Sequence, residues 1–140
     1  VDVLLFDIQD VGVRFYTFIS SLEEFIEAAL SFQKPLVVLD RPNPNGHYID
    51  GPVLDTAYKS FVGMQPVPIV YGMTIGEYAL MLIGENWIKP KTYTYTTAKT
   101  ATTTTYTISS IKQSTPVTVV HNSNYTHQSV YHLPVKPSPN

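Results

Sequence analysis

Apolar residues along the first 41 positions form two short runs, and a segment with helical spacing separates them. The first run, at 1–6, ends in Asp7, and the second, at 35–39, ends in Asp40. Between them, over 15–32, apolar positions recur at intervals of three and four residues, as they do on one face of a helix. Strand, helix and strand in this order predict a βαβ unit, whose strands are parallel and adjacent or nearly so.

The expected helix has two faces. Glu23, Glu24 and Glu27 are expected on the solvent side, and the opposite side is expected to pack on the sheet. The strand at 35–39 is apolar throughout, which predicts a parallel strand covered on both faces. The apolar helix positions are Phe15, Phe18, Ile19, Leu22, Phe25, Ile26, Ala29 and Leu30.

The middle of the chain is less regular. Residues 41–66 are rich in Pro, Gly, Asn and Asp and predict a long loop, a feature that is often functional. A short third strand is expected at 67–70, at an edge or an end because of Pro68. Thr74 and Glu77 have capping-box spacing, which predicts a helix that starts there and stops near Gly84.

Threonine dominates the stretch 89–115, which contains no glycine and no acidic residue. Threonine and tyrosine favour strands, but the uniform run 102–105 specifies no pairing register. We interpret 89–115 as a low-complexity insertion, either a flexible excursion or a polar hairpin. A fourth strand is expected at 117–120, and the chain from Pro134 onward is expected to be irregular coil.

Length and composition fit one soluble globular domain, of the α/β class that the βαβ unit predicts: 140 residues, 44% hydrophobic, with a net charge of −2. That charge predicts neither a nucleic-acid partner nor a membrane surface. Residues 1–88 hold four basic and all eleven acidic residues, a net charge of −7, whereas 89–140 hold five lysines and no acid. No apolar run has the length of a membrane span, and no signal peptide is visible before the first strand. Because both ends are abrupt, we interpret the sequence as a fragment.

Polar residues follow directly on the first strand. Asp7, Gln9 and Asp10 lie where side chains of open α/β sheets face a ligand. A carboxylate there binds sugar hydroxyls or acts as an acid or base. The structural alternative is that Asp10 caps the following helix and Asp7 anchors a turn.

Two arginines, Arg14 and Arg41, lie near these carboxylates in the sequence. Arg14 and Tyr16 offer a fork-shaped donor and a phenol, with a structural Arg–Asp pair as the equally weighted alternative. Asp40 and Arg41 open a proline-stiffened turn that also holds Asn43, so a binding role stands beside plain turn chemistry.

No resident metal or cofactor is expected. His121, His127 and His132 lack the spacing of a metal site, and zero cysteines exclude thiolate ligands and a cysteine nucleophile. The chain has no glycine-rich nucleotide fingerprint and no P-loop.

Several blocks of residues together resemble one family, DUF1343, whose characterised members are NamZ-type exo-β-N-acetylmuramidases. The resemblance covers 1–88 and 117–140, in order. The matching blocks are Phe6–Thr17, Leu39–Gly46, Gly51–Asp55, Ser60–Gly63, Gly72–Glu77, Asn124–His127 and Leu133–Asn140.

The resemblance implies a Rossmann-like domain with a mostly parallel sheet, joined to a smaller C-terminal subdomain across a cleft. In these terms 1–88 is the Rossmann-like core, 89–115 the insertion, and 116–140 the last strand with the start of the subdomain. A family block containing Glu-His-Gly, a further source of the catalytic acid, lies outside this sequence.

The resemblance also implies an activity, the release of N-acetylmuramic acid from non-reducing ends of peptidoglycan fragments by an exported bacterial protein. Its substrates would be muropeptides or MurNAc-GlcNAc saccharides, with Arg14 or Arg41 pairing with the lactyl carboxylate. The rival hypotheses are a non-catalytic muropeptide-binding module and a purely structural domain. The implied catalytic residues are Asp7, Asp10 and Asp40, and the implied substrate-binding residues are Gln9, Arg14, Tyr16, Arg41, Asn43, Tyr125 and His127.

Overall fold

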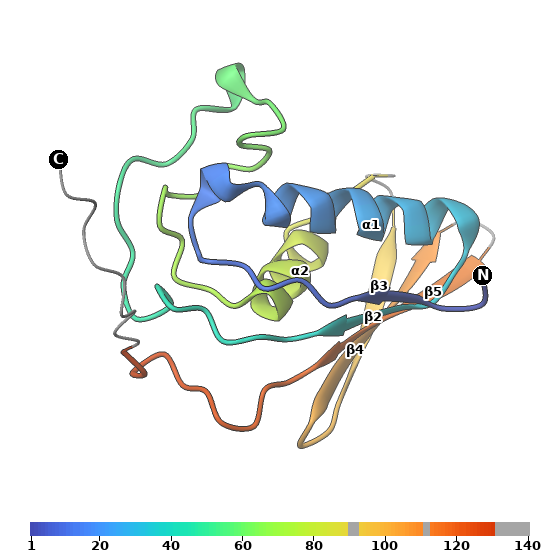
Figure 1. Ribbon diagram of the computed structural model, residues 1–140. Coiled ribbons are helices and arrows are strands. Elements are labelled where there is room, and N and C mark those ends of the chain that lie inside the picture. The colour runs from blue at the N-terminus through green and yellow to red at the C-terminus, as the bar shows by residue number, and fades with distance from the viewer. Residues whose placement is uncertain (90–92, 111–112, 131–140) are drawn as a thin grey trace, which may run out of the picture.

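The structure, a computed structural model, describes residues 1–89, 93–110 and 113–130 (Figure 1). It confirms the α/β class. The strands are β1 (Leu4–Phe6), β2 (Leu36–Leu39), β3 (Thr94–Lys99), β4 (Thr103–Ser110) and β5 (Gln113–Val120). The helices are α1 (Phe18–Phe32) and α2 (Ile75–Gly84), with the short 3-10 helices η1 (Arg14–Tyr16) and η2 (Thr56–Tyr58).

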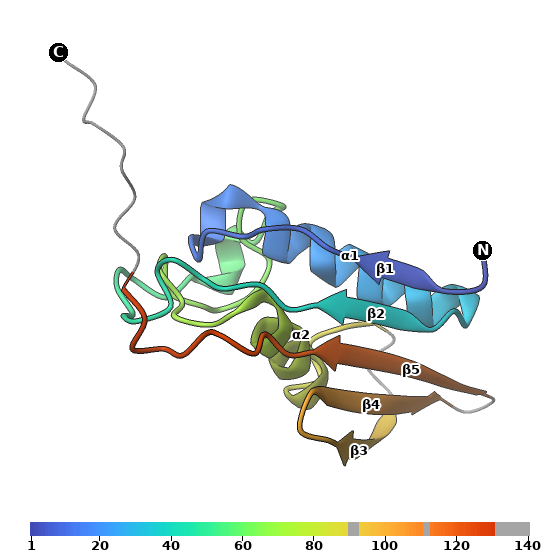
Figure 2. The same cartoon turned by 60° about the horizontal axis from the view of Figure 1, so that its bottom comes forward.

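The five strands form one sheet in the order β1-β2-β5-β4-β3. The predicted βαβ unit is confirmed, because β1 and β2 are parallel neighbours, with Leu4 opposite Leu36. On the other side of β2 lies β5, also parallel, with Val117 opposite Leu36. Because β4 pairs antiparallel with both β5 and β3, four of the five strands run in the same direction (Figure 2).

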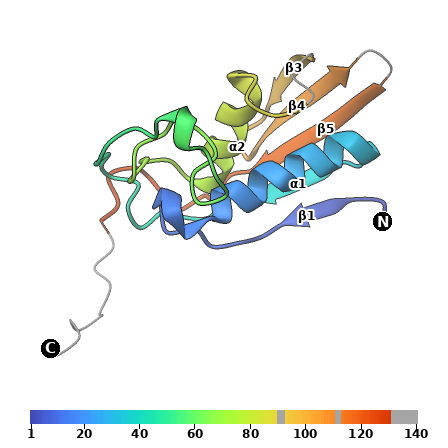
Figure 3. The ribbon, with the colours of Figure 1, turned by 90° about the horizontal axis from the view of Figure 1, so that it is seen from above.

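Both helices lie on the same face of this sheet (Figures 2 and 3). Leu36 and Val38 of β2 point to that face and are fully buried, whereas the alternate residues Val37 and Leu39 are only half-buried. The prediction that this strand is covered on both faces is therefore wrong for the part of the chain that the structure describes. The strand is apolar throughout, but the described helices cover only one of its two faces.

Helix α1 begins three residues later than its apolar pattern predicts. Thr17 has a φ of 73°, in the left-handed region, which ends η1 and separates it from α1. Phe15 therefore belongs to η1 and is 58% exposed. Within α1, Phe25 is exposed as well, so the predicted apolar face is narrower than its residues indicate.

The polar face of α1 contains a second difference, because Glu23 is buried rather than exposed. Gln65, from the long loop, donates a hydrogen bond of 2.7 Å to Oε1 of Glu23. Oε2 has no hydrogen-bond partner among the described residues. Burial, the largest effect, raises the pKa of Glu23. The helical period alone gave no sign of this contact, since the partner is 42 residues away.

Replacing Glu23 with Gln is expected to stabilise the protein in a pH-dependent way. A raised carboxyl pKa contributes stability below the unfolded value, near 4.5, and that contribution is lost as pH rises through the folded value. Glu23→Gln removes the buried charge, so its free energy of unfolding should exceed that of the wild type by about 1–2 kcal/mol at pH 8 and by little at pH 4.

Urea denaturation at the two pH values measures this difference. Glu24→Gln, an exposed position on the same helix, is the control and should leave stability unchanged at both. A loss of stability at pH 8 in Glu23→Gln would show that the ionised carboxylate is the favoured partner of Gln65.

The predicted strand at 67–70 is not present. Val70 makes isolated bridges to Val13 and to Asp50, and the pairing extends no further. Pro68 has no N–H and cannot continue a ladder, which explains why the apolar pattern produced no strand.

The predictions for α2 are confirmed. Thr74 Oγ1 accepts from the backbone N of Glu77, and the Glu77 carboxylate accepts from the backbone N of Thr74, which is a complete capping box. The helix ends at Gly84, as the sequence predicts.

The threonine-rich stretch folds as the polar hairpin, the second of the two alternatives. Strands β3 and β4 pair in a single register, and β5 begins at Gln113, four residues before the predicted strand. Thr104 and Ile108 are buried on the helix-covered face of β4, which distinguishes the two faces of this strand. The uniform run of threonines in the sequence did not show which face would be buried.

The predicted C-terminal coil and His132 lie outside the described residues. Within residues 1–89, 93–110 and 113–130, no helix has the length and apolar character to cross a membrane.

Candidate active site

Strands β1, β2 and β5 point their carboxyl ends to one end of the molecule (Figure 1). Asp7 and Asp40 are the first residues after β1 and β2. The backbone N of Asp40 donates to the carbonyl of Val120 at 2.9 Å, so the loops after β2 and β5 start side by side. Gln9 Nε2 donates to the carbonyl of Pro42 at 2.8 Å and joins the loops after β1 and β2. This end is where parallel sheets hold ligands, and it is our candidate site.

Asp7 pairs with Arg41 across two of these loops. The Nε of Arg41 lies 2.5 Å from Oδ1 of Asp7, and both side chains are more than one-third exposed. This hydrogen bond is the main cause that lowers the pKa of Asp7 and raises that of Arg41. Asp7 is therefore held ionised, beside a guanidinium whose remaining N–H groups point to no described acceptor.

Arg14 does not form the ion pair that the sequence offered as one alternative. Its Nη1 donates to the carbonyls of Val67 and Pro52, at opposite ends of the protruding loop that carries η2. Tyr16 is exposed and packs edge-on against Phe18, with ring centroids 5.0 Å apart. No hydrogen bond or ion pair among the described residues joins Arg14 or Tyr16 to the carboxylates.

Asp10 is buried below the surface of this end, with 4% of it exposed. Its Oδ2 accepts from the backbone N of Gly12 at 2.9 Å and from the hydroxyl of Tyr71. Burial raises the pKa of Asp10 more than hydrogen bonds from the backbone of Gly12 and of Val11 lower it. Asp10 thus fixes the turn after β1; it neither caps a helix nor faces solvent.

Asn43 is also buried, and both ends of its amide are engaged. Nδ2 donates to the carbonyl of Met73 at 2.7 Å, and Oδ1 accepts from the backbone N of Asn45 at 2.8 Å. Gly12, with a φ of +74°, packs directly against this amide, where a Cβ atom would overlap it. Asn43, in the loop after β2, therefore joins this loop to Met73, just before α2, and to the turn at Gly12.

Asp40 lies at the amino end of α2. Its Oδ2 accepts from Thr74 Oγ1 at 2.9 Å, and its Oδ1 accepts from the backbone N of Gly76 at 2.8 Å. Burial raises the pKa of Asp40 and outweighs these two hydrogen bonds, which lower it. The environments of Asp7 and Asp40 thus move their pKa values in opposite directions, a pattern typical of an ionised carboxylate and an acid within one site.

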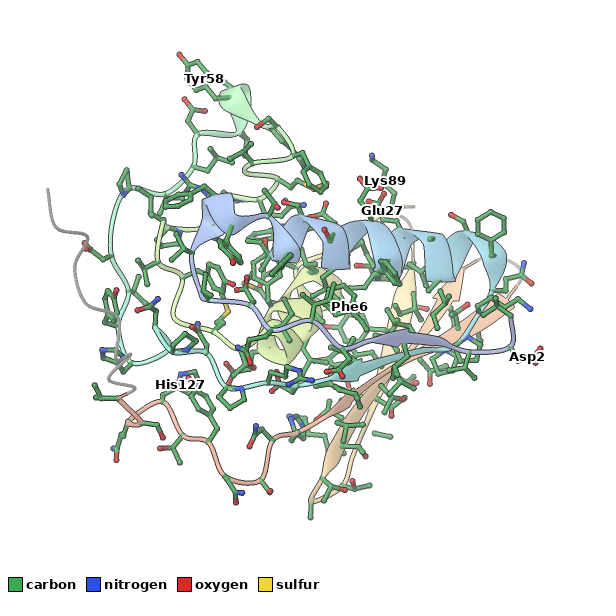
Figure 4. All side chains as sticks on the ribbon, viewed as in Figure 1. Asp2, Phe6, Glu27, Tyr58, Lys89 and His127 are labelled. Carbon is green, nitrogen blue, oxygen red and sulfur yellow. The ribbon has the colours of Figure 1, made fainter. Side chains whose placement is uncertain are left out.

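His127 connects the segment after β5 to the same end (Figure 4). Its Nε2 lies 2.8 Å from Oε1 of Glu77, and its Nδ1 lies 2.8 Å from the carbonyl oxygen of Gly46. The ring of Tyr125 lies edge-on to His127 and its hydroxyl covers Gly46, where a Cβ atom would overlap it. The predicted residues Tyr125 and His127 are therefore brought to the candidate site.

Three residues at this site are not among the predicted catalytic and substrate-binding residues. Thr74 and Gly76 hold Asp40, and Glu77 pairs with His127. The capping box identified Thr74 and Glu77, but it accounts for only one oxygen of Glu77. The second oxygen meets a residue 50 positions away, for which the sequence contains no local signal.

The site combines carboxylates with an exposed arginine and an imidazole, a set suited to binding an acidic sugar and to proton transfer. Within the described ranges, no group of three or more His, Asp or Glu side chains is placed to hold a metal ion.

Comparison with known proteins yields consistent matches. The family "Exo-beta-N-acetylmuramidase NamZ, N-terminal" matches residues 1–140. The chain is 56% identical over 80 residues to the peptidoglycan β-N-acetylmuramidase NamZ of Bacillus subtilis, an alignment that covers 56% of this chain. The crystal structure of a DUF1343 family protein from Bacteroides fragilis superimposes with a TM-score of 0.74 at 46% identity over 99% of this chain. A second DUF1343 structure from that organism gives a TM-score of 0.60 at 48% identity over 63%.

These relatives are much longer. The alignments cover 19% of the Bacillus subtilis protein and 33% and 23% of the two crystal structures.

Proposed function

Because this chain belongs to the NamZ N-terminal family, we propose that it forms part of the saccharide site of a glycoside hydrolase of the cell wall. The reaction is the release of N-acetylmuramic acid from the non-reducing ends of peptidoglycan fragments, by an exported protein with a Rossmann-like domain. The observation that carries the proposal is the identity of 56% with a peptidoglycan β-N-acetylmuramidase, together with the charged groups at the strand ends.

Asp40 and Asp7 are the carboxylates that we assign to the reaction. Glycosidases use one carboxylic acid that protonates the leaving oxygen and one carboxylate on the other side of the scissile bond. The raised pKa of Asp40 suits the acid, and the lowered pKa of Asp7 suits the carboxylate. When Asp40 is protonated, the hydroxyl of Thr74 can rotate and accept a hydrogen bond from it, and the proton stays on Asp40 until it passes to the leaving oxygen. Asp10 supports the turn that follows β1 and Asp7.

Arg41 is our candidate for recognition of muramic acid. Only its Nε is engaged by Asp7, which leaves the outer edge of the guanidinium for the lactyl carboxylate. This carboxylate distinguishes N-acetylmuramic acid from N-acetylglucosamine, so a fork-shaped donor at this position provides the selectivity.

The second candidate is a muropeptide-binding module without turnover. It is favoured by the engagement of Asp40, both of whose oxygens already accept hydrogen bonds from α2. Such a module would use the same arginine and would bind the same saccharides.

Incubation of the chain with a MurNAc-GlcNAc disaccharide distinguishes the two. Release of free N-acetylmuramic acid is expected, and Asp40→Asn should reduce its rate by a factor of about 100 or more. Asp50→Asn, which changes an exposed acid on the neighbouring loop, is the control and should leave the rate unchanged. Binding without release would favour the module, and neither binding nor release would refute both.

A further inference from the structure

His127 ties two distant segments of the chain together. Its Nδ1 meets the carbonyl of Gly46, in the loop after β2, and its Nε2 meets Glu77, in the first turn of α2. Residue 127 itself follows β5, so a single ring joins the segment 121–130 to two other parts of the candidate site.

The partners of the two ring nitrogens favour the protonated form of this ring. The carbonyl oxygen of Gly46 accepts hydrogen bonds only, so Nδ1 must carry a proton. The partner of Nε2 is a carboxylate oxygen of Glu77, whose other oxygen accepts from the backbone N of Thr74 at 2.8 Å. An ionised carboxylate also accepts only, so Nε2 must carry a proton as well. His127 with two donors is an imidazolium.

The loop to which His127 is hydrogen-bonded is the loop that carries Arg41. Residues 40–46 begin at Asp40, which is bound to the amino end of α2, and end at Gly46, which is bound to His127. Between these points, Pro42 accepts from Gln9, and Asn43 bonds to Met73. Of the groups that hold this loop, the imidazole of His127 is suited to change its charge near neutral pH.

We propose that protonated His127 is a positioning residue of the saccharide site, which holds loop 40–46 so that Arg41 meets the muramyl carboxylate. The inference rests on the proposed function for the identity of its ligand, whereas the contacts of His127 with Gly46 and Glu77 are independent of that function. When the ring loses a proton, one of its nitrogens becomes an acceptor that faces another acceptor. The hydrogen bond at that nitrogen is lost, and His127 no longer holds loop 40–46 in place.

The charged groups around the ring favour this protonated form. The hydrogen bond to Glu77 contributes most to raising the pKa of His127, followed by the carbonyl of Gly46, with a further contribution from the charge of Asp40. His121, whose charge acts on Asp40, is hydrogen-bonded to Thr104 Oγ1 through Nε2 at 2.8 Å. Because the folded pKa is raised, the contact is complete below the ordinary value of about 6.5 and is lost as pH rises through the folded value.

Binding of the MurNAc-GlcNAc disaccharide, followed by calorimetry between pH 5.5 and 9, tests the positioning role. The affinity of the wild type is expected to fall about three- to fivefold across the raised pKa, as befits an exposed ion pair. His127→Gln should bind with the weaker affinity at every pH. His47→Gln, at the exposed residue that directly follows loop 40–46, is the control and should retain the pH dependence of the wild type.

Proton NMR of the histidine rings, assigned with the same two variants, reads the contact without ligand. His127 is expected to titrate above 6.5, and a value at or below 6.5 would overturn the imidazolium contact. Saccharide binding whose affinity does not change with pH would overturn the positioning role and leave the proposed function standing. An absence of saccharide binding at every pH would overturn the proposed function and, with it, the positioning role, whatever the NMR titration shows.

Discussion

Gly76→Ala is expected to destabilise the protein by about 3 kcal/mol, although alanine is ordinarily the better residue in a helix. A Cβ atom at Gly76 would lie 2.5 Å from Cγ1 of Val119, in the central strand β5, and 2.7 Å from Cγ of Asp40. Val119 is fully buried and β-branched, so it cannot turn aside. Overpacking of this kind destabilises by about 1–3 kcal/mol, and displacement of Asp40 removes two further hydrogen bonds.

The same substitution at Gly84 is the matched control. Gly84 is the last residue of α2, and a Cβ atom there would meet only the hydroxyl of Tyr95, at 3.8 Å. Urea denaturation should show Gly84→Ala as neutral or slightly stabilising and Gly76→Ala as strongly destabilising. Equal stability of the two variants would mean that the amino end of α2 is not packed on Asp40 as described.

Arg41→Gln is expected to weaken the binding of muramyl saccharides by about 10- to 100-fold. A charge-assisted hydrogen bond contributes about 1.5–3 kcal/mol, and 1.4 kcal/mol corresponds to a factor of ten in affinity. Glutamine keeps a polar side chain but loses the charge and the planar fork. Arg41→Lys, which keeps the charge alone, should fall between the wild type and Arg41→Gln.

The control ligand for this prediction is a GlcNAc-GlcNAc disaccharide, which has no lactyl carboxylate. Its affinity, measured by calorimetry, should be weak and unaffected by Arg41→Gln. Lys59→Gln, which removes an exposed cation on the protruding loop, should change neither affinity. An equal loss for both saccharides would show that Arg41 acts by holding Asp7 and the loops rather than by contacting the carboxylate.

Predictions from the sequence succeeded where neighbours in the chain determine the structure. The parallel pair β1 and β2, the capping box of α2 and its end at Gly84 all depend on spacings of a few residues. Contacts between distant residues were missed for the complementary reason. Glu23 is buried because a residue 42 positions away supplies its hydrogen bond.

The same limit applies to the candidate site. Its location at the strand ends follows from the order of strand, helix and strand, and Asp7, Asp40 and His127 are brought there. The partner of Asp7 is Arg41 rather than Arg14, because the loops after β1 and β2 lie side by side in the fold. Whether an aspartate lies buried or exposed depends on the turn that follows, and Asp10 faces Tyr71 from a loop 61 residues further along.

The central place of β5 in the sheet has a consequence for how the chain acquires its structure. Strand β2 pairs with β5 across 81 positions, from Leu36 to Val117, whereas β5 pairs with its neighbour in the chain, β4, with Gln113 opposite Ser110. Local hairpins close in microseconds, but pairings of high sequence separation make folding slow. During synthesis, one edge of β2 therefore stays unpaired until β5 is complete, when about residue 120 has left the ribosome. We expect the local pairing of β4 with β5 to form before β5 joins the open edge of β2.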